Sequence, residues 1–96
     1  METRVAVIAI IVENPDVVTE LNQIIHEYAQ WVIGRMGIPY AKKEISIISL
    51  AVDAPQDVIS TLSGKIGRVS GISVKTAYSN VMTKMGETSD ANTNTR

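Results

Sequence analysis

The sequence of 96 residues contains no cysteine and no phenylalanine, and its aromatic residues are one tryptophan and three tyrosines. Without cysteine, the chain offers no disulfide, no thiolate ligand for zinc or an iron–sulfur cluster, and no thiol nucleophile. An excess of one charge is also missing, because nine Lys and Arg stand against ten Asp and Glu. Nucleic-acid binders and polybasic membrane-surface proteins carry a clear excess of Lys and Arg, so this balance argues against both classes.

Long hydrophobic runs are absent as well. The longest run covers residues 5–12, and these eight residues are far fewer than the about 20 that a transmembrane helix requires. The run is followed by Glu13-Asn14-Pro15 rather than by the small-residue cleavage site of a signal peptide. We therefore expect a buried strand here, no membrane partner, and a cytoplasmic protein.

The first half of the chain predicts a strand, a helix and a second strand. Residues 5–12 are rich in Val and Ile, which is typical of a strand that is apolar on both faces. The stretch Asn14-Pro15-Asp16 offers an N-cap, a first-turn proline and an acidic residue, which together open a helix. Two glycines and a proline after Trp31 end it, so residues 32–40 are expected to form the second strand. The apolar residues of this helix recur at helical spacing over about four turns: Val17, Val18, Leu21, Ile24, Ile25, Tyr28 and Val32.

The second half repeats the pattern after a polar turn. Residues 45–53 are again rich in Ile and Val and predict a third strand. Asp53-Ala-Pro-Gln56 resembles a capping arrangement for a second helix, and residues 72–78 alternate as a fourth strand does. We expect one domain over residues 1–80 and a flexible polar tail over residues 81–96.

The element order β-α-β-β-α-β predicts the fold class. Two right-handed split β-α-β units give an α+β, ferredoxin-like (βαββαβ) domain, with a four-stranded antiparallel sheet and both helices on one face. Such a sheet leaves its other face without helices.

Both faces of the predicted sheet are apolar. In the first strand, we expect Val5, Val7, Ala9 and Ile11 to meet the helices and Ala6, Ile8, Ile10 and Val12 to face away, although a register change would exchange the two sets. Whichever set faces away from the helices forms an exposed apolar surface of roughly several hundred Å², which is unusual for a soluble monomer. We therefore expect a homo-oligomer, a dimer or a tetramer, that forms through the sheet face or a sheet edge.

The residues that could carry chemistry are few. The single histidine, His26, has no strong metal ligand at helical spacing on its own helix, so we expect a surface or interface residue rather than a metal site. Gly34-Arg35-Met36-Gly37 could let backbone amides and a guanidinium approach an anion, or its glycines could serve a bend, a bulge or close packing. A nucleophile triad cannot be assembled, and no catalytic residue, metal site or cofactor is predicted.

Several segments together resemble the small, stand-alone iron-only ([FeFe]) hydrogenase system regulators. The resemblance covers about residues 4–80, and Gly34-Arg-Met-Gly-Ile-Pro-Tyr40 is its most specific part. The remaining segments are residues 4–13, His26-Glu-Tyr28, residues 45–49 and residues 64–75.

This resemblance implies an ACT-like domain related to the ligand-binding half of the nickel-responsive regulator, and members that are dimers or tetramers. The nickel regulator's site uses His and Cys, which one histidine and no cysteine cannot reproduce. We also expect no DNA-binding segment before the first strand, so that any control of transcription would act through an unidentified protein partner.

The resemblance thus implies a non-enzymatic, oligomerising regulatory domain of an iron-only hydrogenase system that senses a small ligand at a subunit interface. By analogy with ACT-like assemblies, the predicted ligand-binding residues are Glu13, Asn14, Arg35 and Tyr40. Two alternatives stay open: a dimeric ferredoxin-like enzyme of the oxygenase or isomerase type, and a ligand-free assembly scaffold. A pocket lined by Arg35 or Tyr40 would favour the sensor. A pocket under the first helix with a buried acid would favour the enzyme, and a filled interior would favour the scaffold.

Overall fold

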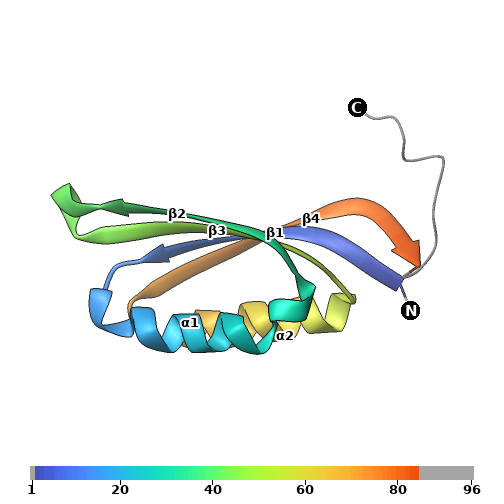
Figure 1. The fold of residues 1–96 in the computed structure, drawn as a ribbon, viewed down its shortest axis with the longest axis horizontal. Coiled ribbons are helices and arrows are strands. Elements are labelled where there is room, and N and C mark those ends of the chain that lie inside the picture. Colours follow the sequence, from blue (N-terminus) through green and yellow to red (C-terminus); the bar gives the residue numbers. More distant parts are fainter. Residues whose placement is uncertain (1, 85–96) are drawn as a thin grey trace.

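The computed structural model of the protein describes residues 2–84, which form one layer of strands and one layer of helices (Figure 1). None of the helices in this part of the chain is long and apolar enough to cross a membrane. The elements in chain order are β1 (Glu2–Val12), the 3-10 turn η1 (Pro15–Val17), α1 (Val18–Glu27), η2 (Ala29–Trp31), β2 (Val32–Tyr40), η3 (Ala41–Lys43), β3 (Ile45–Ala54), α2 (Gln56–Gly67) and β4 (Ile72–Lys84).

The four strands form one antiparallel sheet in the order β2-β3-β1-β4. Strands β1 and β3 occupy the centre, so β2 and β4 are the two edges. Both helices cover the same surface of the sheet, as Figure 1 shows. The predicted ferredoxin-like α+β fold is confirmed.

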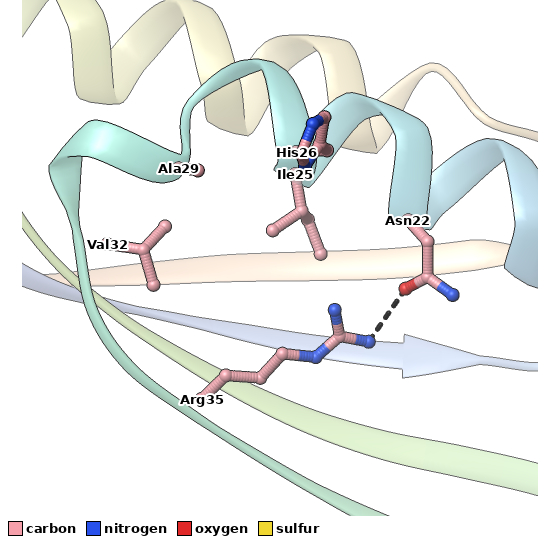
Figure 2. Close-up of a pocket in the computed structure, with 6 residues that line it drawn as sticks. All are labelled: Asn22, Ile25, His26, Ala29, Val32 and Arg35. Carbon is pink, nitrogen blue, oxygen red and sulfur yellow. Dashed lines mark hydrogen bonds between the residues drawn. The ribbon is translucent and has the colours of Figure 1, made fainter.

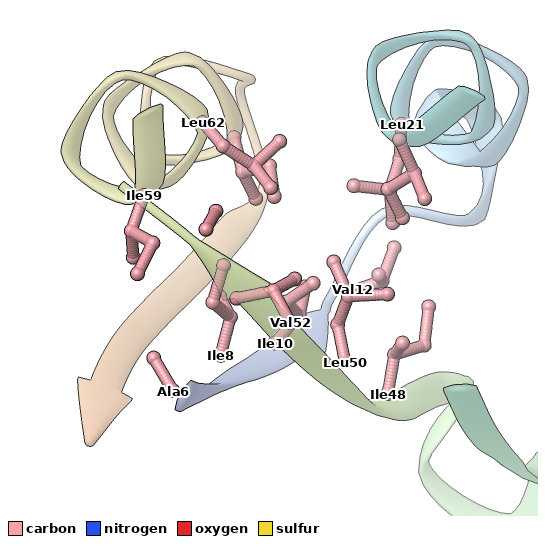
Figure 3. Close-up of a cluster of buried hydrophobic side chains, with 13 residues drawn as sticks. Ala6, Ile8, Ile10, Val12, Leu21, Ile48, Leu50, Val52, Ile59 and Leu62 are labelled. Atoms are coloured by element: carbon pink, nitrogen blue, oxygen red, sulfur yellow. The ribbon is translucent and has the colours of Figure 1, made fainter. Parts of the chain in front are cut away.

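The core lies between the helices and one face of the two central strands (Figure 3). In the β1–β3 pair, Ile8 is opposite Leu50 and Ile10 is opposite Ile48, so large side chains pair across the ladder. From the helices, fully buried Leu21 of α1 and Ile59 and Leu62 of α2 pack onto them.

The expected assignment of the two faces of β1 is therefore wrong. Ala6, Ile8, Ile10 and Val12 face the helices and are at most 1% exposed. The alternate residues Val5, Val7, Ala9 and Ile11 are on the face without helices. The physical reason is the register with β3, which places the bulky pairs of β1 and β3 together on the side that the helices can cover.

The first helical segment is divided where the sequence predicted one helix of about four turns. The Asn14 side-chain Oδ1 accepts a hydrogen bond from the Asp16 backbone N–H at 3.0 Å, so Asn14 does cap the first turn, but this turn is the 3-10 turn η1. The apolar stripe keeps its predicted direction, because Leu21 and Ile25 are buried and Tyr28 packs against the core. Pattern and capping therefore identified this segment correctly, and only its regularity differs.

The start of α2 corrects a second expectation. Pro55 is the N-cap residue and makes no side-chain capping bond, and Asp53 is an exposed residue of β3. Gln56 instead uses its side-chain oxygen to accept a hydrogen bond from Arg4 of β1. The similarity to a capping box was misleading, because β3 continues to Ala54 and keeps Asp53 in the ladder opposite Val5.

The first and last strands of the chain, β1 and β4, are longer than predicted. β1 begins at Glu2, and β4 runs to Lys84 because Glu2, Thr3 and Arg4 pair with its last residues. An edge strand tolerates the polar residues Ser79 and Asn80, since one of its sides faces solvent. Residues 81–84 of the predicted tail therefore belong to β4, and residues 85–96 lie outside the described residues.

Candidate functional site

A groove runs along the helix-covered side of the edge strand β2, between β2 and the segment formed by η1 and α1. Three adjoining pockets of about 310, 240 and 310 Å³ make up this groove. Arg35 lines the first and second pockets, and Pro39 and Ser46 line the second and third. We call it the α1–β2 groove and name its first pocket, next to the end of α1, the Arg35 pocket.

Arg35 enters the groove because of its register on β2. It is opposite Leu50 of β3, whose side chain is buried under the helices, so Arg35 is on the helix side of the sheet. The pairing between β2 and β3 shifts between Val32 and Gly34, which marks a bulge at the start of the strand. Without this shift, the alternation would place Arg35 on the other face.

The Arg35 guanidinium is held by an amide of α1. Its Nη2 donates a hydrogen bond of 2.8 Å to Oδ1 of Asn22 (Figure 2). The Arg35 pocket is lined by Asn22, Ile25, His26, Ala29, Val32 and Arg35, and none of these six residues carries a carboxylate. This pocket therefore presents a positive charge whose hydrogen-bond partner from α1 is neutral.

His26 is at the rim of the same pocket. Figure 2 shows the Arg35 side chain extending from β2 toward Asn22, whereas the His26 ring is turned away from Arg35. His26 is exposed, in agreement with the expected surface residue. Among the described residues, no group of three or more His, Cys, Asp or Glu could hold a metal ion.

The predicted ligand-binding residues fall at three places in the fold. Arg35 lines the Arg35 pocket, and Tyr40 lines the third pocket with Val12 and Pro15, beside the loop after β1. Glu13 and Asn14 belong to that loop, where the Glu13 N–H donates to the Gly71 carbonyl at 2.7 Å and Asn14 caps η1. The groove thus connects Tyr40 and Arg35 through Pro39, while Asn14 has a local structural role.

Sequence reasoning did not identify Asn22 as a partner of Arg35. The available signal was its position, one helical turn before His26 on the polar face of α1. This signal does not say which strand lies opposite, so the contact became visible only in the folded chain.

The two helices are joined at a different place, away from the groove. Lys65 of α2 lies 3.3 Å from the Glu27 carboxylate of α1, and its Nζ is 5.2 Å from the centre of the Tyr28 ring. The interaction with Tyr28, and secondly the one with Glu27, raises the pKa of Lys65 above 10.5. This cluster links α1 to α2 and is a surface ion pair rather than part of a binding site.

The second notable surface is the sheet face opposite the helices, which we call the open face. Its large apolar side chains come from β1, β2 and β3, and each is at least 40% exposed. Register defines the face: Ile38 of β2 is opposite Ile47 of β3, which in turn is opposite Ile11 of β1. Its large members are Val5, Val7, Ile11, Met36, Ile38 and Ile47.

Comparisons with known proteins point to one family. The family model "TM1266-like: Iron-only hydrogenase system regulator, putative" matches residues 4–76. A solved structure, described as that of the uncharacterized protein TM1266 from Thermotoga maritima, is 30% identical in sequence. Its similarity covers 79% of this chain and 96% of that chain, with a TM-score of 0.76. A search of curated proteins finds no match.

Proposed function

Because the chain belongs to the TM1266-like family of iron-only hydrogenase system regulators, we propose that it is a non-enzymatic regulatory domain. In this proposal the domain assembles with further copies of itself and responds to a small ligand. The observation that carries the assembly is the open face, on which side chains from three adjacent strands are large, apolar and at least 40% exposed.

A second copy of the chain is the occupant that best fits the open face. In one row across the sheet, the three isoleucines Ile38, Ile47 and Ile11 follow one another on β2, β3 and β1. The net charge of the chain is only −1, so two copies repel each other little. Burial of such a surface in a face-to-face pair would remove apolar area from water and stabilise the assembly.

The composition of the α1–β2 groove supports a sensor over an enzyme. An enzyme would need a buried acid or base in the pocket under α1, whereas the titratable side chains that line the Arg35 pocket, His26 and Arg35, are both exposed and neither is a carboxylate. A pocket lined by Arg35 or Tyr40 favours the sensor over a scaffold with a filled interior, and pockets of about 310 Å³ lined by these residues lie along the groove. This volume matches the lower end of the range for small-molecule sites.

Ligand and assembly would be coupled through β2. Arg35 is on the helix side of this strand, and Met36 and Ile38 of the same strand contribute to the open face. A ligand that holds β2 in one position would favour the assembly that needs this position, and the shift would equal the difference in ligand affinity between the two states. The regulatory signal would then be the oligomeric state, read by another protein.

The assembly is tested by replacing Ile47 with lysine. Ile47 is at the centre of the open face, so Ile47→Lys should convert the oligomer into a monomer of 10.4 kDa, because a buried charge without a partner opposes association. The measurement is size-exclusion chromatography with light scattering at micromolar concentration. The matched control is Gln23→Lys, which adds the same charge on the exposed side of α1 and should leave the mass unchanged.

Two results would contradict this assembly. One is a wild-type chain that is already a monomer at micromolar concentration. The other is an Ile47→Lys variant that keeps the oligomeric mass while its circular dichroism shows the native fold.

Native mass spectrometry of protein purified without oxygen or chelator tests the sensor. Extra bound mass supports the sensor, and an oligomer without bound mass supports the scaffold.

A further inference from the structure

The chemistry of the Arg35 pocket defines the class of ligand that it would take. Its polar side is the Arg35 guanidinium with the Asn22 amide, and its apolar side consists of Ile25, Ala29 and Val32. Nη2 of Arg35 donates one hydrogen bond to Asn22. The other N–H groups of the same guanidinium can donate to a further acceptor. Arg35 is exposed, so a ligand can reach these donors from solvent.

The charge of the pocket matches a monoanion. Arg35 is the cation of the lining, and the His26 ring is turned away from it. In the described part of the chain, the ion pair within 4.0 Å is that of Lys65 with Glu27, so Arg35 has no carboxylate partner of its own there. A planar guanidinium with two free parallel donors pairs with a carboxylate in a bidentate manner.

We infer that the Arg35 pocket binds a small organic monocarboxylate with a short aliphatic chain. The carboxylate pairs with Arg35, and the chain lies against Ile25, Ala29 and Val32. The lining offers no anion for an ammonium group, so an amino acid would leave its amino group without a partner. Phosphate is disfavoured because a dianion would meet one guanidinium and an apolar wall. This inference rests on the proposed ligand response and names its ligand.

Asn22 acts as a positioning residue in this site. Its Oδ1 holds Nη2 at 2.8 Å and so directs the guanidinium into the pocket under α1. Loss of this contact frees the Arg35 side chain, which carries several rotatable bonds, and binding then has to order it. Asn22→Ala should therefore weaken binding less than the loss of Arg35 itself.

Butyrate is the probe for the test, and binding is followed by amide chemical shifts of the ¹⁵N-labelled full chain. We expect saturable shifts at Asn22, Val32 and Arg35, and no saturable shifts with butyramide, butylamine or inorganic phosphate. Arg35→Gln should weaken butyrate binding by about tenfold or more, since a charge-assisted pair is lost. Arg68→Gln removes the same charge from an exposed site at the end of α2 and should leave the affinity unchanged.

Three outcomes would overturn the inference. They are the absence of saturable butyrate shifts at the pocket, equal weakening by Arg35→Gln and Arg68→Gln, and phosphate binding at least as tight as butyrate binding. The proposed assembly has its own test, which is the mass of the Ile47→Lys variant. The butyrate titration can be carried out on the monomer or on the oligomer, so the two proposals can fail independently. The native amide spectrum of Arg35→Gln shows that a loss of binding does not come from unfolding.

Discussion

On β1, the side chain of Ile10 is fully buried beneath the helices, whereas Ile11, the next residue of the same strand, is 41% exposed. The residue type, the strand and the central place in the sheet are the same for both. The two residues differ in the face on which they lie, because both crossover connections place their helices on the side of Ile10 (Figure 3). An apolar residue in this sheet therefore stabilises the single chain only if a helix covers its face, and otherwise it is available for another surface.

The largest expected effect compares these two neighbours directly. Ile10→Ala should lower the free energy of unfolding by about 2–5 kcal/mol, because it leaves a cavity in a packed core. Ile11→Ala should cost about 1 kcal/mol in the single chain, since its side chain is already partly in water. Urea denaturation followed by circular dichroism measures both values.

Protein concentration sharpens this comparison. If copies associate through the open face, the cost of Ile11→Ala should grow with concentration, because the assembly buries this side chain. The cost of Ile10→Ala should stay constant. Equal costs for both variants at every concentration would contradict the difference between the faces.

The next effect compares two glycines, one in the turn between α2 and β4 and one on the open face. Gly71 has a φ of +80°, and a Cβ added there would lie 2.6 Å from Cβ of Asn14. Gly71→Ala should therefore destabilise the chain by about 2 kcal/mol, through backbone strain and the displaced loop after β1.

Gly34 is the matched control. It is opposite Ala51, on the open face, and an added Cβ would meet nothing within 4 Å. Gly34→Ala should leave stability unchanged or raise it by about 0.5 kcal/mol, because alanine restricts the unfolded chain. Thermal unfolding of both variants decides the matter, and a large loss from Gly34→Ala would show that the open face is packed against something.

The smallest effect concerns the outer surface of the helices, which belongs to neither face of the sheet. Since Tyr28 and then Glu27 raise the pKa of Lys65, protonated Lys65 favours the folded state below pH 10.5. This contribution is lost as the pH rises through the higher pKa of the folded chain. Lys65→Met should be slightly less stable than the wild type at neutral pH, and the two should converge in alkaline denaturation series.

The same comparison explains which parts of the fold could be predicted. The alternation in β1 and β3 showed that both faces were apolar, and the helical spacing of Leu21 and Ile25 identified the buried side of α1. Neither pattern states which face of β1 the helices cover, because an alternating strand reads the same from both sides. The register of Ile8 with Leu50, formed by residues far apart in sequence, makes that choice.

The site divides in a similar way. Arg35 between two glycines was a visible candidate for an anion contact. Its partner Asn22 was not, because the hydrogen bond joins a strand and a helix whose relative position depends on the whole sheet. Asn14 was visible as a cap and fulfils that role, which ties it to the loop rather than to Arg35.

The order of the elements, the ferredoxin-like fold class and the excess of apolar surface could be predicted from the chain alone, because they follow from local spacing and composition. The burial of Ile10, the exposure of Ile11 and the hydrogen bond between Arg35 and Asn22 beside α1 became known from the folded chain. The physical reason is that strand register and helix placement come from contacts between distant segments. Those contacts are set by the packing of Ile8, Ile10, Ile48 and Leu50 beneath two helices.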